Sequence, residues 1–168
     1  MGALSRTFRG AVLVPVLLVL TSLSTGFAQQ KPLKIDELAK RAEVVAVGRV
    51  TDLKSEWADG QSQIITRVTL AVDEYLKGEA DAASAVTIVT LGGEIGEVGE
   101  FYTHVPSFRP NENVVVFLEK TDVAEFVVTG GTQGKYNIER NPKTGRAIVA
   151  GEQTLEDFTA AVRKASQR

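Results

Sequence analysis

The amino-acid types that carry most covalent and metal chemistry are scarce in this chain. It has no cysteine and a single histidine in 168 residues. The missing cysteine excludes disulfides, thiol catalysis, cysteine-ligated zinc and covalent haem attachment. A single histidine also excludes any metal site with several histidine ligands. The sequence therefore predicts a fold that is stabilised by its core alone and that holds no cofactor.

An apolar stretch near the start of the chain has the pattern of a secretory signal peptide. Arg6 and Arg9 precede an apolar run, residues 11–20, and small residues at Gly26 and Ala28 occupy the positions that signal peptidase reads. The run falls short of the roughly 20 apolar residues that a membrane-spanning helix needs. An uncleaved anchor is the alternative interpretation.

We therefore expect residues 1–28 to form a signal peptide that is cleaved after Ala28. The mature chain then starts at Gln29 and is secreted or periplasmic, with no stable membrane span. Residues 29–168 have a length that fits one domain with its own core.

The charge of the mature chain argues against nucleic acid as a partner. The signal contains two of the 19 basic residues and none of the 21 acidic ones. The mature chain is therefore mildly acidic, and it has no basic stripe to neutralise phosphates.

The hydrophobic pattern predicts a short helix, a series of strands and a closing helix. The first helix is expected at residues 33–42, and the last is expected to start at Thr154, whose hydroxyl would cap it. The expected strands are 43–53, 62–76, 85–91, 113–120, 125–139 and 146–150. Glycines at 130, 131 and 134 interrupt the strand at 125–139 and predict sharp coiling or a bulge where it crosses from one part of the sheet to another. Trp57 and Asp59-Gly60 are expected in a hairpin loop, and residues 92–112 in a long loop or irregular hairpin.

Consecutive strands with few helices favour a mainly β fold. We predict a small antiparallel OB-like barrel of five to six strands, with a short N-terminal helix and a C-terminal helix.

Several segments resemble a family of uncharacterised secreted bacterial proteins. They are AEVVAVGRV, TRVTLAV followed by YLKG, TLGGEIGEVG, FRPNENVVVFLE and GGTQGKYNI. The chain is also remotely similar to netrin-like modules of the metalloproteinase-inhibitor class, through Gly48-Arg49-Val50, Leu76-Lys77-Gly78 and the apolar strand at 114–118. This similarity implies an OB-type barrel. It does not transfer the inhibitory mechanism, which needs an N-terminal cysteine.

The glycine-rich segment at 92–100 is the candidate metal site. Glu94, Glu97 and Glu100 recur every third residue, and hard cations prefer carboxylate oxygens. The spacing lacks the ligand pattern of a known calcium loop, so a solvated turn is the alternative interpretation.

Catalytic motifs are weak. His104 lies near Ser107 and is the only imidazole available as a general base; a loop histidine bonded to its neighbours is the alternative. The glycines at 131 and 134 precede a strand instead of a helix, which argues against a phosphate loop.

Aromatic residues define a candidate partner surface. Trp57 lies in the expected hairpin loop, Phe101 lies in the long connection, and Tyr136 lies on the fifth expected strand. The candidate surface residues are Trp57, Tyr102, His104, Phe108, Arg109 and Tyr136. The alternative is that most of them close the ends of the barrel. These features favour a secreted, non-enzymatic module that binds an extracytoplasmic protein or other ligand. The alternatives are a netrin-like inhibitor of an extracellular protease and a metal-dependent or hydrolytic enzyme that uses residues 92–108.

Overall fold

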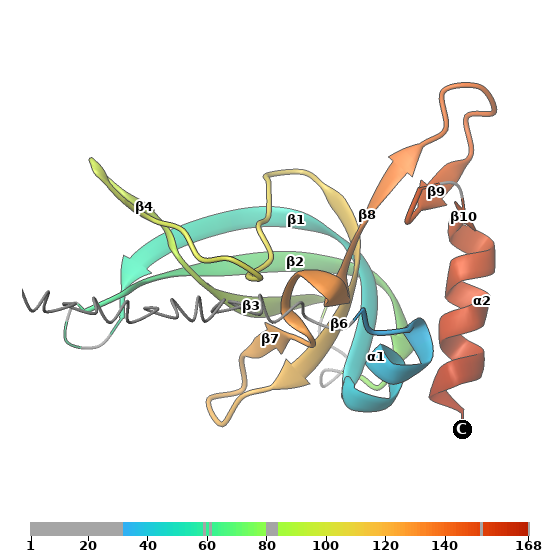
Figure 1. The fold of residues 1–168 in the computed structure, drawn as a ribbon, viewed down its shortest axis with the longest axis horizontal. Helices are drawn as coiled ribbons and strands as arrows, with labels where there is room; N and C mark the ends of the chain where they lie inside the picture. Colours follow the sequence, from blue (N-terminus) through green and yellow to red (C-terminus); the bar gives the residue numbers. More distant parts are fainter. Residues whose placement is uncertain (1–31, 59, 61, 80–83, 152, 168) are drawn as a thin grey trace, which may run out of the picture. The chain divides into compact units, whose positions relative to one another are not determined.

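A computed structural model describes residues 32–58, 60, 62–79, 84–151 and 153–167 (Figure 1). The predicted signal peptide and the expected mature terminus lie outside these residues. The helices are α1 (Ile35–Arg41), the 3-10 turn η2 (Gly131–Gly134) and α2 (Leu155–Ser166). The strands are β1 (Val44–Trp57), β2 (Ile64–Lys77), β3 (Ala85–Leu91), β4 (Gly93–Ile95), β5 (Val98–Glu100), β6 (Asn113–Lys120), β7 (Phe126–Val128), β8 (Lys135–Arg140), β9 (Ala147–Val149) and β10 (Gln153–Thr154).

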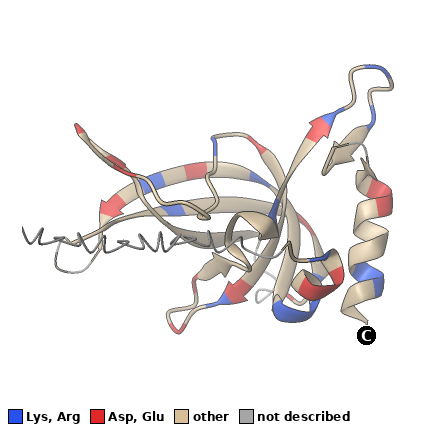
Figure 2. Cartoon of the chain, in the orientation of Figure 1, with Lys and Arg blue, Asp and Glu red and all other residues tan. Residues whose placement is uncertain are grey.

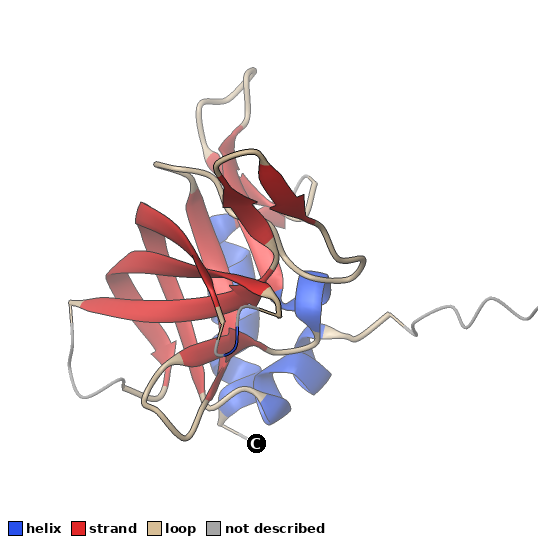
Figure 3. Ribbon diagram, turned by 90° about the vertical axis from the view of Figure 1, so that its left-hand side faces the viewer, coloured by secondary structure: helices blue, strands red, loops and turns tan. Residues whose placement is uncertain are grey.

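Five strands close into a barrel in the order β1, β2, β3, β7, β6 and back to β1. Four of the neighbouring pairs are antiparallel, and β3 runs parallel to β7 through the pair Ile88 and Phe126. The predicted small OB-like barrel with a short N-terminal helix and a C-terminal helix is therefore confirmed, with one parallel pair in place of a wholly antiparallel sheet. Figure 3 shows the strands curving round to close it.

The core has two layers, because β1 and β6 are buried on both faces. Val45 and Phe117 belong to a cluster that also contains the buried residues of both helices, whereas Ala46 and Val116 belong to the cluster inside the barrel. Successive side chains of a strand point to opposite faces, so a run of valines supplies both layers. This explains why these two segments are continuously apolar.

The two helices pack together on the outer layer, at the end of the barrel away from β4 (Figure 1). The hydroxyl of Thr154 accepts a hydrogen bond from the Asp157 backbone N–H at 3.2 Å, which confirms the predicted N-cap of α2. Lys77 Nζ donates to the carbonyl oxygens of Ala39 and Ala42 at 2.7 and 2.6 Å. A cation at these free carbonyls stabilises the C-terminus of α1 and ties it to β2.

The prediction of one coiled strand over residues 125–139 is wrong. The chain forms β7, leaves the sheet as η2 and returns as β8, and both strands pair with β6. Gly130 has φ 68°, and a Cβ on Gly134 would collide with the backbone oxygen of Thr129. The three glycines therefore produce a complete break where the sequence pattern predicted coiling or a bulge within one strand. After the break, β8 continues beyond the barrel to pair with β9.

One connection also differs from the prediction, while the long connection at 92–112 agrees with it. Trp57 is the last residue of β1, paired with Ile64 of β2, instead of a residue in the hairpin loop. Gly60 has φ 78°, as expected of a turn, while Asp59 lies outside the described residues. Residues 92–112 contain a short hairpin, β4 and β5, followed by an irregular loop.

Candidate functional site

One end of the barrel opens beneath the β4–β5 hairpin. Leu53 and Ser55 of β1 lie on the strand face that continues into the barrel, and Ser55 pairs with Thr66 of β2. Their hydroxyl oxygens are 3.0 Å apart, and the Thr66 hydroxyl donates to the Gly92 carbonyl at 2.7 Å. A Cβ on Gly93 would collide with both hydroxyl oxygens. The hairpin therefore passes directly over the barrel end, and only glycine allows this approach.

A cavity of about 330 Å³ lies at this end, and we call it the mouth pocket. Its lining comes from the ends of three barrel strands, the hairpin and the loop that follows. The lining residues are Leu53, Ser55, Thr66, Thr90, Leu91, Gly92, Gly93, Glu94, Glu100, Phe101, Tyr102, Val105, Pro106, Ser107 and Phe108. Apolar walls with a few polar groups, at the mouth of a β-barrel, are typical of ligand sites.

Glu100 anchors the hairpin to the barrel. Its Oε2 accepts hydrogen bonds from the Ile64 backbone N–H at 2.9 Å and from the Tyr102 hydroxyl at 3.1 Å. The Gly92 N–H donates to the Ile64 carbonyl at 2.8 Å. The loop is fixed in turn, because the Thr90 hydroxyl donates to the Pro106 carbonyl at 3.2 Å. These bonds preform the mouth pocket, although its parts are distant in the sequence.

The three glutamates of the hairpin do not converge on one point. Glu94 pairs with Gly99 and Glu100 pairs with Gly93, which places the two carboxylates on opposite faces of the hairpin. Glu97 lies in the turn between the strands. In a single extended segment Glu94 and Glu100 would share a face, and the turn between β4 and β5 separates them. Within the described residues, no group of three or more acidic or histidine side chains is placed to hold a metal ion.

Exposed apolar side chains are concentrated on the elements that form the mouth pocket, and three of them, Leu91, Phe101 and Tyr102, line it. Seven large hydrophobic residues are exposed in the described part of the chain, and five of them lie on β1, β3, the hairpin or the residues directly after it. These five are Trp57, Leu91, Val98, Phe101 and Tyr102. Phe101 is 81% exposed. Such a concentration at one end differs from the scattered exposed apolar residues of an ordinary surface.

Phe108 and Arg109 have mainly structural contacts. Phe108 is half-buried against the barrel cluster, and Lys135 Nζ lies 5.0 Å from its ring centroid. The Lys135 ammonium also forms an ion pair with Glu112 at 2.9 Å. Arg109 is exposed, and its backbone N–H donates to Glu112 Oε1 at 2.9 Å. Phe108 therefore forms a supported wall of the mouth pocket.

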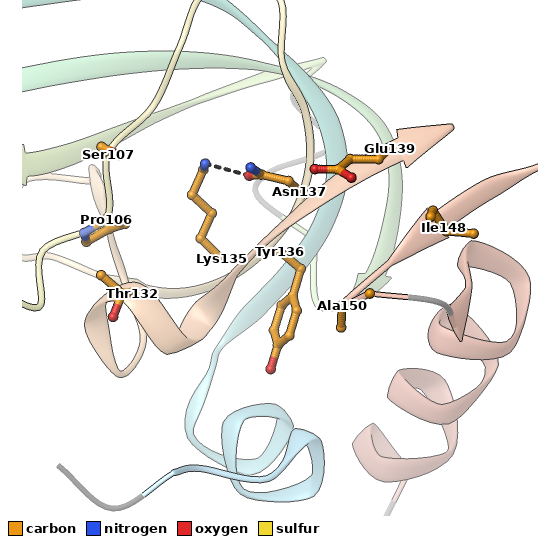
Figure 4. A pocket seen from close by; sticks show the side chains of 10 residues that line it. Pro106, Ser107, Thr132, Lys135, Tyr136, Asn137, Glu139, Ile148 and Ala150 are labelled. Carbon is orange, nitrogen blue, oxygen red and sulfur yellow. Dashed lines mark hydrogen bonds between the residues drawn. The ribbon is translucent and has the colours of Figure 1, made fainter. Parts of the chain in front are cut away.

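A second, open groove of about 510 Å³ lies along β8 (Figure 4). Lys135 points towards the loop at Ser107 and donates to Asn137 Oδ1 at 2.7 Å. Tyr136 points the other way, and its ring lies between Phe117 and Phe158, with centroid distances of 5.9 and 4.9 Å. Burial raises the pKa of the Tyr136 hydroxyl above its ordinary value. The Tyr136 ring belongs to the packing between the barrel and α2.

His104 and Ser107 are not brought into one cavity. His104 has φ 66° in an exposed turn, and its carbonyl accepts the Thr132 N–H at 3.1 Å. Ser107 lines both cavities, whereas His104 lines neither of them. The role that the geometry gives His104 is to join the loop to η2 through its backbone.

The candidate residues therefore lie in three places. Trp57, Tyr102 and Phe108 lie at the barrel mouth, Tyr136 packs against the outer core layer beside the β8 groove, and His104 and Arg109 lie in the loop. Sequence reasoning did not select Leu91, Ser55 or Thr66 as site residues. The alternation along β2 gave a signal for Thr66, since a hydroxyl residue occurs there on the apolar face.

The chain was compared with known proteins. No family model matches it, and no curated protein matches it. Among the helices of the described residues, none is long and apolar enough to cross a membrane.

Proposed function

We propose that this protein is a secreted or periplasmic, non-enzymatic module that binds a partner protein through the mouth of its barrel. The observation that carries the proposal is the set of exposed apolar side chains at a preformed cavity: Leu91, Phe101 and Tyr102 line it, while Trp57 ends β1 and Val98 lies on the hairpin. Exposed aromatic residues on a rigid scaffold are the usual anchors of protein interfaces, since they bury much area at a low entropic cost.

The rigidity of the surface supports this assignment. The hairpin beside Phe101 is fixed by the Glu100 carboxylate and by the glycine contacts at 92 and 93. A surface that is already ordered loses little conformational entropy when a partner binds. In contrast, acid–base or nucleophilic catalysis needs a base and a nucleophile within hydrogen-bond reach, and His104 and Ser107 do not share a cavity.

Capture experiments with surface variants test the proposed interface. We expect Phe101→Ala and Trp57→Ala each to weaken capture of a partner from the native extracytoplasmic fraction by at least about tenfold, the effect of losing a central aromatic anchor. Val123→Ala is the matched control, because Val123 is an exposed apolar residue in the connection between β6 and β7. Quantitative pull-down and thermal unfolding of each variant are the measurements.

Two outcomes contradict the interface. One is a partner retained equally by all three variants. The other is no partner captured by the unaltered protein. Both substituted residues are exposed, so we expect each variant to keep the unfolding temperature of the parent.

The proposed location is tested at the N-terminus. We expect the protein in its native host to be found outside the cytoplasm and its intact mass to correspond to a chain beginning at Gln29. Cell fractionation followed by mass spectrometry provides both readings. A full-length chain in the cytoplasm contradicts the proposed location and leaves the binding surface to be tested separately.

A further inference from the structure

The mouth pocket is acidic as well as apolar. Its ionisable lining residues that carry charge at neutral pH are Glu94 and Glu100, and no lysine or arginine lines it. The sequence has no lysine or arginine between Gly78 and Phe108. Figure 2 shows acidic residues, and no basic ones, on the β4–β5 hairpin. An anionic ligand would therefore meet like charge at this end of the barrel.

The nearest cations on the neighbouring strands form ion pairs, and Lys54 of β1 shares Glu56 with Arg67. Arg67, next to Thr66 on β2, forms ion pairs with Glu56 and Glu125. Lys135, on the far side of the Phe108 ring, is paired with Glu112. Neither cation is left to compensate the charge of the hairpin.

The Glu100 carboxylate is fixed in place through one of its two oxygens, and the other can accept further hydrogen bonds. Both of its hydrogen bonds within the described structure go to Oε2, which leaves Oε1 without a protein partner there. The side chains of Glu94 and Glu97 form no ion pair or hydrogen bond in the same part of the chain. A carboxylate that is held by one oxygen and free at the other is ready to accept from a cationic donor.

Aromatic and apolar side chains stand beside these charges. Phe101 and Tyr102 are exposed next to Glu100, and Leu53 and Phe108 line the interior. Arginine suits such a site best, because its stem packs on apolar surface while its planar guanidinium stacks on aromatic rings and bonds carboxylates. A volume of about 330 Å³ lies at the lower end of the range for small-ligand sites, which suits one side chain better than a larger molecule.

From this charge complementarity we propose that the mouth pocket binds an arginine side chain of a basic segment in the partner protein. The inference rests on the proposed function and specifies its partner. The guanidinium lies against Tyr102 or Phe101 and donates to Glu100, with Glu94 adding to the field.

A titration with two nearly identical small molecules tests the charge requirement. The probes are Nα-acetyl-arginine methylamide and its citrulline analogue, in which a neutral urea replaces the guanidinium at nearly the same size. We expect the arginine probe to shift amide resonances of residues 90–108 in the ¹⁵N-labelled protein and to bind about fivefold more tightly than the citrulline probe. That factor is the size that one partly exposed charge pair gives.

Charge-neutral variants locate the interaction. Glu100→Gln should remove most of the difference between the probes, and Glu94→Gln should reduce it. Glu94→Gln also covers the case in which Glu100→Gln fails to fold, because Glu94 has no role in anchoring the hairpin. Glu139→Gln is the control, since Glu139 is an exposed carboxylate in the other groove. It should leave the difference unchanged.

The possible failures are distinguishable. The arginine site is overturned if the two probes bind equally. It is also overturned if the amide resonances shifted by the arginine probe belong to residues of the groove along β8. If neither probe binds while Phe101→Ala still abolishes capture of the partner, the interface stands and its arginine occupant is wrong. If capture also fails, the proposed function fails with it.

Discussion

Replacing Phe158 with alanine is expected to lower the free energy of unfolding by about 3 to 5 kcal/mol, the range for deleting a buried aromatic side chain. Phe158 is fully buried and connects α2 to the outer face of the barrel. The centroid of its ring lies 4.9 Å from that of Tyr136, and the centroids of Tyr136 and Phe117 are 5.9 Å apart. The substitution therefore leaves a cavity in a continuous aromatic cluster. The fixed strands on either side cannot collapse to fill it.

Urea unfolding followed by circular dichroism measures this loss. Lys164→Ala is the matched control on the same helix, because Lys164 is exposed and its substitution should change stability by less than about 0.5 kcal/mol. A loss below about 1 kcal/mol for Phe158→Ala would mean that α2 contributes little to the packing of the barrel.

Elements whose signals are local were predicted well. The bounds of β3 and β6 agree with the predicted strands, and Thr154 caps α2 as expected. Each depends on neighbours in the chain: a short apolar run between polar residues, or a hydroxyl three residues before an acid. The double burial of β6 was also visible, since its apolar residues are consecutive instead of alternating.

Elements decided by distant contacts were not predicted. The glycines after Val128 were expected to produce a coil or a bulge in one strand, yet the chain leaves the sheet as η2, which contacts the backbone of the His104 turn. Whether a glycine permits a bend or a complete break depends on what lies opposite it, and here the opposite segment is more than 20 positions earlier in the sequence.

The candidate site shows the same division. The aromatic residues near the hairpin were identified by type, but their arrangement depends on Glu100 accepting from Ile64, a contact across 36 positions. The same glutamates were considered as metal ligands from their spacing. Pairing within the hairpin separates Glu94 from Glu100, and this pairing follows from the turn at Gly96, which has φ 60°. The spacing of residues along the chain therefore predicted which residue types lie at the site. The register of the strand pairing determined which of their side chains face one another.

Neutralising Glu112 as Glu112→Gln is expected to cost about 3 kcal/mol of unfolding free energy, the effect of leaving a buried charge without its partner. The side chains of Lys135 and Glu112 are only 9% and 14% exposed, and their charged atoms are 2.9 Å apart. Because glutamine keeps the shape of the side chain, the loss of unfolding free energy measures the effect of removing the charge. Lys135 would retain Asn137 and the face of Phe108, neither of which supplies a compensating negative charge.

The double variant Lys135→Met/Glu112→Gln separates this charge effect from lost packing. Because it removes the unpaired ammonium as well, it should be more stable than Glu112→Gln alone, with a coupling energy of at least about 1 kcal/mol in a double-mutant cycle. Glu74→Gln is the control, because it breaks the exposed ion pair between Glu74 and Arg163. The side chain of Arg163 is 42% exposed and that of Glu74 is 49% exposed, so the substitution should cost less than about 1 kcal/mol of unfolding free energy. A coupling near zero would contradict the buried pair. A large coupling would mean that the Lys135 charge fixes the Phe108 wall of the mouth pocket. Breaking the pair between Lys135 and Glu112 would then also weaken the binding of any ligand that packs against this wall.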